Sequence, residues 1–225
     1  VVTLDSDTAG SQMFVNQAGV EQVAQVLVDS VYDMAGGEGE FAVLSASSTA
    51  TNQNAWIAAM EEIAEDEEYA QLERVPIAYG DDEPQKATDQ TQALLDNYPD
   101  LKVICAPTTV GIMAAAKLVQ DKPDCKVKIT GLGLPSEMLE YTGADDAHSC
   151  PYFYLWDMQL LGKLSAYATI ALINGDITGA EGDSFTVEGL GDFTVTKADD
   201  GGTEIVQGLP LQFNQDNIEE MAKLY

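Results

Sequence analysis

The hydrophobic and polar positions of the chain switch repeatedly between two periods. Short, mostly apolar runs predict buried strands at 41–44, 72–79, 103–106, 127–130 and 153–155. Apolar residues at three- and four-residue spacing predict helices at 20–34, 52–65, 84–97, 110–118, 135–141 and 157–174. Strands that alternate with helices through short connections are typical of βαβ units. The pattern therefore predicts an α/β fold with a parallel sheet flanked by helices.

The two ends of the chain depart from this alternation. Val1–Leu4 is expected to form a strand that ends in the polar segment Asp5-Ser6-Asp7. After Gly175, short apolar runs flank two glycines and predict a hairpin of 185–187 with 193–195. Further strands are expected at 204–206 and 211–213, and a last helix at 216–224. We thus expect an antiparallel appendage in addition to the parallel body.

The stretch FAVLSASSTATNQNAW, residues 41–56, concentrates amide side chains after a predicted strand. In open α/β sheets, ligands bind outside the carboxyl ends of the strands. Asn52, Gln53 and Asn54 can each donate and accept hydrogen bonds, which suits neutral polyhydroxylated ligands. The alternative is that Thr51 or Asn52 only caps the following helix. Capping accounts for one polar residue, whereas three amides occur here beside Trp56.

Composition narrows the classes of partner. The 225 residues include 38 acidic and 10 basic ones, which gives a net charge of −28. Nucleic acids are therefore not expected as partners, because binding their phosphates requires clustered Lys and Arg. No apolar run approaches the roughly 20 residues of a membrane span. Since the chain opens directly in a strand-like segment, we expect it to be a piece of a longer parent.

The sequence offers little catalytic or metal-binding chemistry. Its three cysteines lack metal-ligand spacing and there is one histidine, so we expect no catalytic metal and no cofactor. Cys105 is expected to be buried, and pairing of Cys125 with Cys150 remains open. Phosphate-binding loops and nucleophile elbows are absent. Asp5 and Asp7 fit either a glycosidase acid pair or a polar turn, and the residues alone leave this open.

Six motifs then occur in order along the chain: VVTLDSD, FVNQ, SASSTATNQNAWI, ICAPTT, ITGLGLP and LWD. In this order they resemble the rhamnose-type solute-binding proteins of bacterial ABC sugar importers. These are related to the receptors for the furanosyl autoinducer, within the ribose-binding-protein superfamily. The resemblance runs essentially from residue 1 to 225 and implies the type I periplasmic-binding-protein fold. In that fold, two α/β lobes joined by three crossover strands clasp the ligand.

The resemblance also implies a division of the chain. Residues 1–11 would end the first lobe and form the first crossover, and residues 12–148 would form the complete second lobe. Residues 149–185 would return to the first lobe, and 186–225 would supply the hairpin, the last crossover and a closing helix. The first lobe would then be incomplete, with roughly the first hundred residues of a parent absent.

The family's ligand contacts, carried over by position, fall on Asp5, Asn52, Gln53, Pro107, Thr109 and Trp156, with Asp157 beside them. Two departures bear on the ligand. The autoinducer receptors have Asp at the position of Asn52, so the site here is less acidic and favours a neutral deoxyhexose. Many ribose binders have Asp at the position of Gly133, which makes ribose a poorer candidate.

The resemblance thus implies an extracytoplasmic protein that binds rhamnose or a similar sugar and delivers it to an ABC permease, without catalysis. We expect any attachment to the membrane to come from a lipid anchor outside this chain. The alternatives are a receptor for the furanosyl autoinducer and a sugar-sensing effector domain of a transcription regulator. Turnover of a chromogenic glycoside would identify an enzyme instead.

Overall fold

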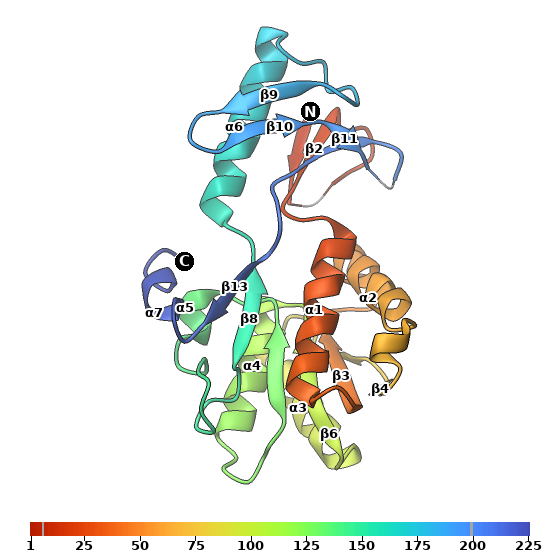
Figure 1. Cartoon of the computed structure of the whole chain (residues 1–225), viewed down its shortest axis with the longest axis vertical. Coiled ribbons are helices and arrows are strands. Elements are labelled where there is room, and N and C mark those ends of the chain that lie inside the picture. The colour runs from red at the N-terminus through yellow and green to blue at the C-terminus, as the bar shows by residue number, and fades with distance from the viewer. Residues whose placement is uncertain (6, 199) are drawn as a thin grey trace. The chain divides into compact units, whose positions relative to one another are not determined.

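The computed structural model describes residues 1–5, 7–198 and 200–225, which form two compact units (Figure 1). Unit 1 consists of Val1–Gly19 and Trp156–Pro210. Unit 2 consists of Val20–Leu155 and Leu211–Tyr225. In this described part of the chain, no helix has the length and apolarity that crossing a membrane requires.

A parallel sheet forms the centre of unit 2 and confirms the predicted α/β fold. Its strand order is β4 (Leu72–Arg74), β3 (Gly39–Ser45), β6 (Leu101–Ala106) and β7 (Lys128–Gly131). The short β5 (Ala78–Tyr79) also pairs with β3, so the run around Pro76 forms two short strands along one side of β3. Helices cover both faces of the sheet, which explains why its central strands β3 and β6 are buried over most of their length.

The helices of unit 2 follow the apolar periodicity of the sequence. Helices α1 (Val20–Ala35) and α2 (Thr51–Ile63) pack together, as do α3 (Pro84–Asn97) and α4 (Thr109–Gln120). In Figure 1, α1 lies in front of the sheet and α4 behind it. The apolar stripe of α1 is buried, as expected, at Val23, Ala24, Leu27, Val28 and Val31.

Strand β8 (Tyr152–Leu155) differs from the expected last parallel strand. It pairs antiparallel with β13 (Leu211–Asn214), and a single parallel bridge joins Tyr154 to Leu132 after β7. Phe153 and Phe213 face each other on this pair with ring centroids 5.3 Å apart, and both are buried.

Two predicted helices of unit 2 are shorter than expected. Helix α5 is Pro135–Met138, because the carbonyl of Tyr141 accepts from the N–H of Cys150 (3.0 Å) and Thr142 bridges to Cys150. Strand-like pairing thus begins where the sequence predicts a last helical turn. Helix α7 is Ile218–Met221, and it packs on α5 and β13. A 3₁₀ turn at Glu67–Tyr69 is an element that the sequence did not indicate.

Unit 1 is built on a four-stranded sheet. Its order is β1 (Val2–Leu4), β2 (Met13–Asn16), β12 (Thr203–Val206) and β11 (Thr196–Lys197). Helix α6 (Met158–Asn174) packs on β1 and β2. The expected hairpin is present as β9 (Ser184–Val187) and β10 (Gly191–Thr194), paired antiparallel. β2 and β11 were not predicted.

The limits of the two units differ from those of the lobes that the resemblance implies. Residues 12–19 belong to unit 1, because β2 pairs with β1 and β12. Residues 211–225 belong to unit 2, because β13 pairs with β8 and α7 packs on α5. The assignment of the units to the family's lobes therefore stays a prediction.

The three cysteines are free thiols in this structure. Cys105 is fully buried in β6, as expected for an inert core thiol. Burial raises the pKa of the Cys105 thiol to about 12. Cys150 is also buried, whereas Cys125 is partly exposed, so the disulfide that the sequence left open is not formed.

Candidate functional site

The predicted site residues of unit 2 follow the carboxyl ends of its central strands. β3, β6 and β7 are parallel, so the segments after Ser45, Ala106 and Gly131 leave the sheet at the same edge. Asn52 and Gln53 lie in the first turn of α2, which follows β3. Pro107 and Thr109 connect β6 to α4. The structure thus brings these four residues to one edge of one sheet.

Asn52 is the exposed amide of this group. The N-cap of α2 is Ala50, and no side chain caps the helix there, so neither Thr51 nor Asn52 occupies the capping position. The Asn52 Oδ1 accepts from the N–H of Gln53 (2.9 Å). Its Nδ2 group has no such bond among the residues that the structure describes, which leaves two donors for a ligand.

Gln53 has a structural role in addition to any contact with a ligand. Its side chain is buried, and its Oε1 accepts from the Ser45 hydroxyl (2.7 Å) and from the N–H of Ala46 (2.8 Å). This carboxamide therefore ties the first turn of α2 to the end of β3. Trp56 is buried on the same helix with Ile57 and Met60 and belongs to the core.

Pro107 and Thr109 flank a residue that forms an unexpected contact. Pro107 is buried, and Thr109 is partly exposed at the start of α4. Between them, the hydroxyl of Thr108 donates to the carboxylate of Asp82. Asp82 is exposed and has a φ of 51° in the turn after β5, so a carboxylate lies at this edge of the sheet. Sequence reasoning missed Asp82, although two successive aspartates after a strand were a usable signal.

The other predicted residues lie in unit 1. Asp5 directly follows β1 with a φ of 65°, and burial raises the pKa of its carboxyl above the ordinary value. Trp156 is 8% exposed and immediately precedes Asp157. Asp157 is the N-cap of α6, and its Oδ1 accepts from the N–H groups of Gln159 and Leu160, both at 2.9 Å. Asp157 therefore stabilises the start of α6, and its Oδ2 accepts no hydrogen bond from the residues that the structure describes.

Gln207 is a further polar residue of unit 1 that sequence reasoning did not select. Its Nε2 donates to the backbone carbonyl of Asp157 (3.0 Å). Its Oε1 is buried and accepts no hydrogen bond from any residue that the structure describes. A buried acceptor of this kind costs free energy unless another group pairs with it. The sequence could not indicate this role of Gln207, because its contact with Asp157 joins residues 50 positions apart and forms only in the folded chain.

Asp7, the second member of the acid pair considered above, takes part in a local turn. Its Oδ1 accepts from the Thr3 hydroxyl and from the N–H of Thr8 (2.8 Å). Burial raises the pKa of Asp7, but hydrogen bonds from Thr3, Ser11 and Thr8 outweigh this and lower it overall. Asp7 thus fits the polar-turn alternative, with its carboxylate committed to ordering the segment after β1.

Comparison with known proteins identifies the family of this chain. Residues 1–177 match the model of the periplasmic binding protein domain. The chain is 55% identical to an ABC transporter solute-binding protein from Clostridium phytofermentas, solved with bound L-rhamnose. That match has a TM-score of 0.94 and covers 100% of this chain and 73% of the other.

Two further solved structures are similar. A sugar ABC transporter protein from Actinomyces odontolyticus is 43% identical, with a TM-score of 0.85 over 98% of this chain and 70% of that one. LsrB from Clostridium saccharobutylicum, in complex with AI-2, is 21% identical, with a TM-score of 0.82 over 97% and 72% of the chains. The last of these supports the fold alone. Together, the fold, the family model and the identities show that this chain belongs to the periplasmic binding protein domain family.

Proposed function

We propose that this protein binds L-rhamnose or a closely similar neutral sugar outside the cytoplasm and delivers it to an ABC permease. The family and the similar solved structures are solute-binding proteins, so the protein binds without catalysing a reaction. The observation on which the proposal rests is the 55% identity, over the whole chain, to a solute-binding protein that holds L-rhamnose.

The chemistry of the candidate residues supports a neutral sugar. Asn52 offers two amide donors, and the segment at Pro107–Thr109 adds backbone groups and a hydroxyl. In unit 1, the Asp5 carboxylate can accept from sugar hydroxyls, and the indole of Trp156 can stack on the apolar face of a sugar ring. A 6-deoxyhexose such as rhamnose has hydroxyl groups for these polar contacts and an apolar surface for stacking, because its terminal carbon is a methyl group instead of a hydroxymethyl group.

The proposal is tested by titrating the protein with L-rhamnose, ribose and the furanosyl autoinducer, with intrinsic tryptophan fluorescence as the signal. We expect saturable binding of L-rhamnose at about 1 μM or tighter, and weak or no response to the other two. A response to the autoinducer alone would overturn the assignment of the ligand and favour the receptor alternative.

Two variants locate the binding. Asn52→Ala removes the exposed amide and is expected to weaken L-rhamnose binding about tenfold or more. Asn97→Ala makes the same change at the exposed last residue of α3, away from the candidate residues, and should bind like the unaltered protein. Equal affinities of all three proteins would exclude Asn52 from the site.

A further inference from the structure

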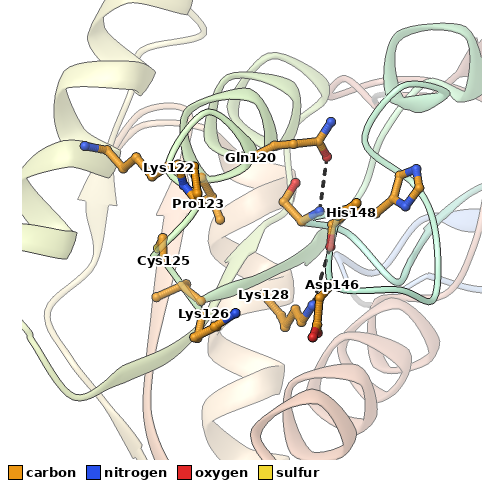
Figure 2. Close-up of a pocket in the computed structure, with 12 residues that line it drawn as sticks. Gln120, Lys122, Pro123, Cys125, Lys126, Lys128, Asp146 and His148 are labelled. Atoms are coloured by element: carbon orange, nitrogen blue, oxygen red, sulfur yellow. Dashed lines mark hydrogen bonds between the residues drawn. The ribbon is translucent and has the colours of Figure 1, made fainter.

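A pocket of unit 2 has a chemistry unlike that of the candidate sugar residues. It encloses about 230 Å³ and is lined by Lys122, Lys126 and Lys128, together with Gln120, Asp146 and His148 (Figure 2). Its residues lie at the start of β7 or before β7 and β8, whereas the candidate sugar residues follow the carboxyl ends of β3 and β6. Because the central strands are parallel, the two groups lie at opposite edges of the sheet.

The pocket lies in the part of the chain where basic residues are concentrated. Residues 101–128 contain five of the ten basic residues and two of the 38 acidic ones. The chain as a whole has a net charge of −28, so acids are abundant as partners for lysines. Even so, Lys122, Lys126 and Lys128 form no ion pair within the residues that the structure describes. The lining thus has three lysines against one carboxylate, that of Asp146, and this excess of positive charge favours an anionic ligand.

The lysine side chains of the pocket differ in direction. Lys126 and Lys128 reach the side of the pocket where Asp146 lies, and Lys122 extends away from them (Figure 2). The Lys128 Nζ is held by the backbone carbonyl of His148 (3.4 Å), which fixes its direction. Asp146 opposes one of these charges, so the lining retains a positive excess.

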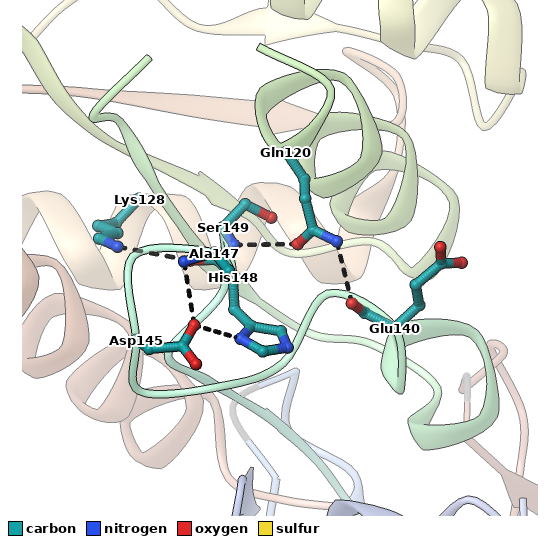
Figure 3. Close-up of polar contacts among 7 residues, drawn as sticks. All are labelled: Gln120, Lys128, Glu140, Asp145, Ala147, His148 and Ser149. Atoms are coloured by element: carbon teal, nitrogen blue, oxygen red, sulfur yellow. Dashed lines mark hydrogen bonds and ion pairs between the residues drawn. The ribbon is translucent and has the colours of Figure 1, made fainter. Parts of the chain in front are cut away.

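One wall of the pocket is formed by the loop of residues 145–149, which hydrogen bonds hold in place (Figure 3). The Asp145 Oδ1 accepts from the N–H of Ala147 (3.0 Å) and contacts the His148 Nδ1 (2.6 Å). The Gln120 side chain accepts from the N–H of Ser149 (3.2 Å) and donates to the carbonyl of Glu140 (3.0 Å). These bonds fix the wall before any ligand arrives, which lowers the entropy that binding must overcome.

We propose that this pocket binds a phosphate group, held by Lys126 and Lys128, with Lys122 closing on it from the rim. Lysine contacts phosphate as a point charge through a flexible stem, so the long Lys122 side chain can turn toward a bound anion. The ligand class is a phosphate monoester or diester, either of a soluble molecule or of a lipid headgroup. This site is independent of the sugar site and of the function proposed above.

The test is a titration of the protein with inorganic phosphate, followed by the amide shifts of residues 120–128 and 145–149 in NMR spectra. We expect saturable shifts with a Kd of about 1 mM or tighter. Lys126→Gln combined with Lys128→Gln should weaken binding about tenfold or more. Lys197→Gln combined with Lys223→Gln removes the same charge elsewhere and should leave binding unchanged.

Unchanged dispersion of the remaining amide signals in the NMR spectra of both double variants shows that they are folded. Absence of saturable phosphate shifts in the unaltered protein would overturn the proposal, and so would equal weakening by the two double variants. Competition of phosphate by glycerol phosphate, with no binding to phosphatidylglycerol vesicles, would support a soluble ligand. Binding to phosphatidylglycerol vesicles that phosphate reverses, with no binding to phosphatidylcholine vesicles, would support a headgroup.

Discussion

At the scale of single residues, the backbone conformation of Gly131 determines how closely two strands approach at the edge of the sheet where the candidate sugar residues lie. Gly131 ends β7 with a φ of 143°, and a Cβ built there would lie 2.0 Å from the carbonyl oxygen of Ala106. Only glycine allows the ends of β6 and β7 to approach this closely. The segments that follow both strands therefore depend on this residue.

Gly131→Ala is accordingly expected to lower the free energy of unfolding by about 2 kcal/mol or more, through backbone strain and the clash with Ala106. Gly162→Ala is a matched control, because Gly162 lies inside α6 and a Cβ there meets nothing within 4 Å. We expect that control to be neutral or stabilising by about 0.5–1 kcal/mol. Urea unfolding of both variants measures the difference, and equal stabilities would contradict the role given to Gly131.

A second residue-scale prediction concerns pH. The Asp183 Oδ2 accepts from the N–H and hydroxyl of Thr178 (2.6 and 2.8 Å) and from the N–H groups of Gly179 (3.1 Å) and Ala180 (3.2 Å). The bonds from Thr178, followed by those from Ala180 and Gly179, hold the pKa of Asp183 below its ordinary value. A carboxyl whose pKa is lowered in the folded state contributes to stability at pH values above its ordinary pKa of about 4. This contribution is lost as the pH falls through the pKa of the folded state.

Asp183→Asn should therefore lower the melting temperature at neutral pH, and the difference from the unaltered protein should shrink as the pH falls below about 4. Thermal melts at a series of pH values follow this, with Asp192→Asn as a control whose carboxylate accepts from one hydroxyl, that of Thr186. A difference that persists at low pH would show that the ionised carboxylate is not the cause.

At the scale of elements, the spacing of apolar residues was sufficient to predict most helices and strands of the fold. Helix α1, helix α3 and strands β3, β6 and β7 lie close to their predicted bounds, since each buries its own apolar pattern. β11 was missed because it is two residues long, and β2 because its pairing with β12, 190 residues away, is not visible in the local sequence. The placement of Asn52 at a strand end was predictable from local order, whereas the contacts of Asp82 and Gln207 depend on tertiary folding.

Gln53 shows how one side chain joins two elements. Gln53→Ala leaves the N–H of Ala46 and the hydroxyl of Ser45 without their shared acceptor, and both lie in a buried region. We expect a loss of about 1–3 kcal/mol in the free energy of unfolding. Gln85→Ala removes an exposed glutamine of α3 that contacts Asp89, and should change stability by less than about 0.5 kcal/mol. Equal losses in denaturant unfolding would show that Gln53 does not tie α2 to β3.

At the scale of the whole molecule, the excess of acidic residues sets how stability depends on salt. A net charge of −28 makes the folded chain repel itself, and among the described residues lysine and arginine form two close ion pairs, Arg74 with Glu61 and Lys86 with Asp81. Screening should therefore relieve more repulsion than attraction. We expect the melting temperature to rise between about 10 mM and 150 mM sodium chloride, where the screening length falls from about 30 to 8 Å. A fall in thermal melts over this range would contradict the account.

The most direct test of the central claim is calorimetric titration of the protein with L-rhamnose. We predict saturable binding of one sugar per chain, with a Kd of about 1 μM or lower. Absence of binding heat at several temperatures, together with an unchanged melting temperature in excess L-rhamnose, would contradict the proposed ligand while leaving the family assignment intact.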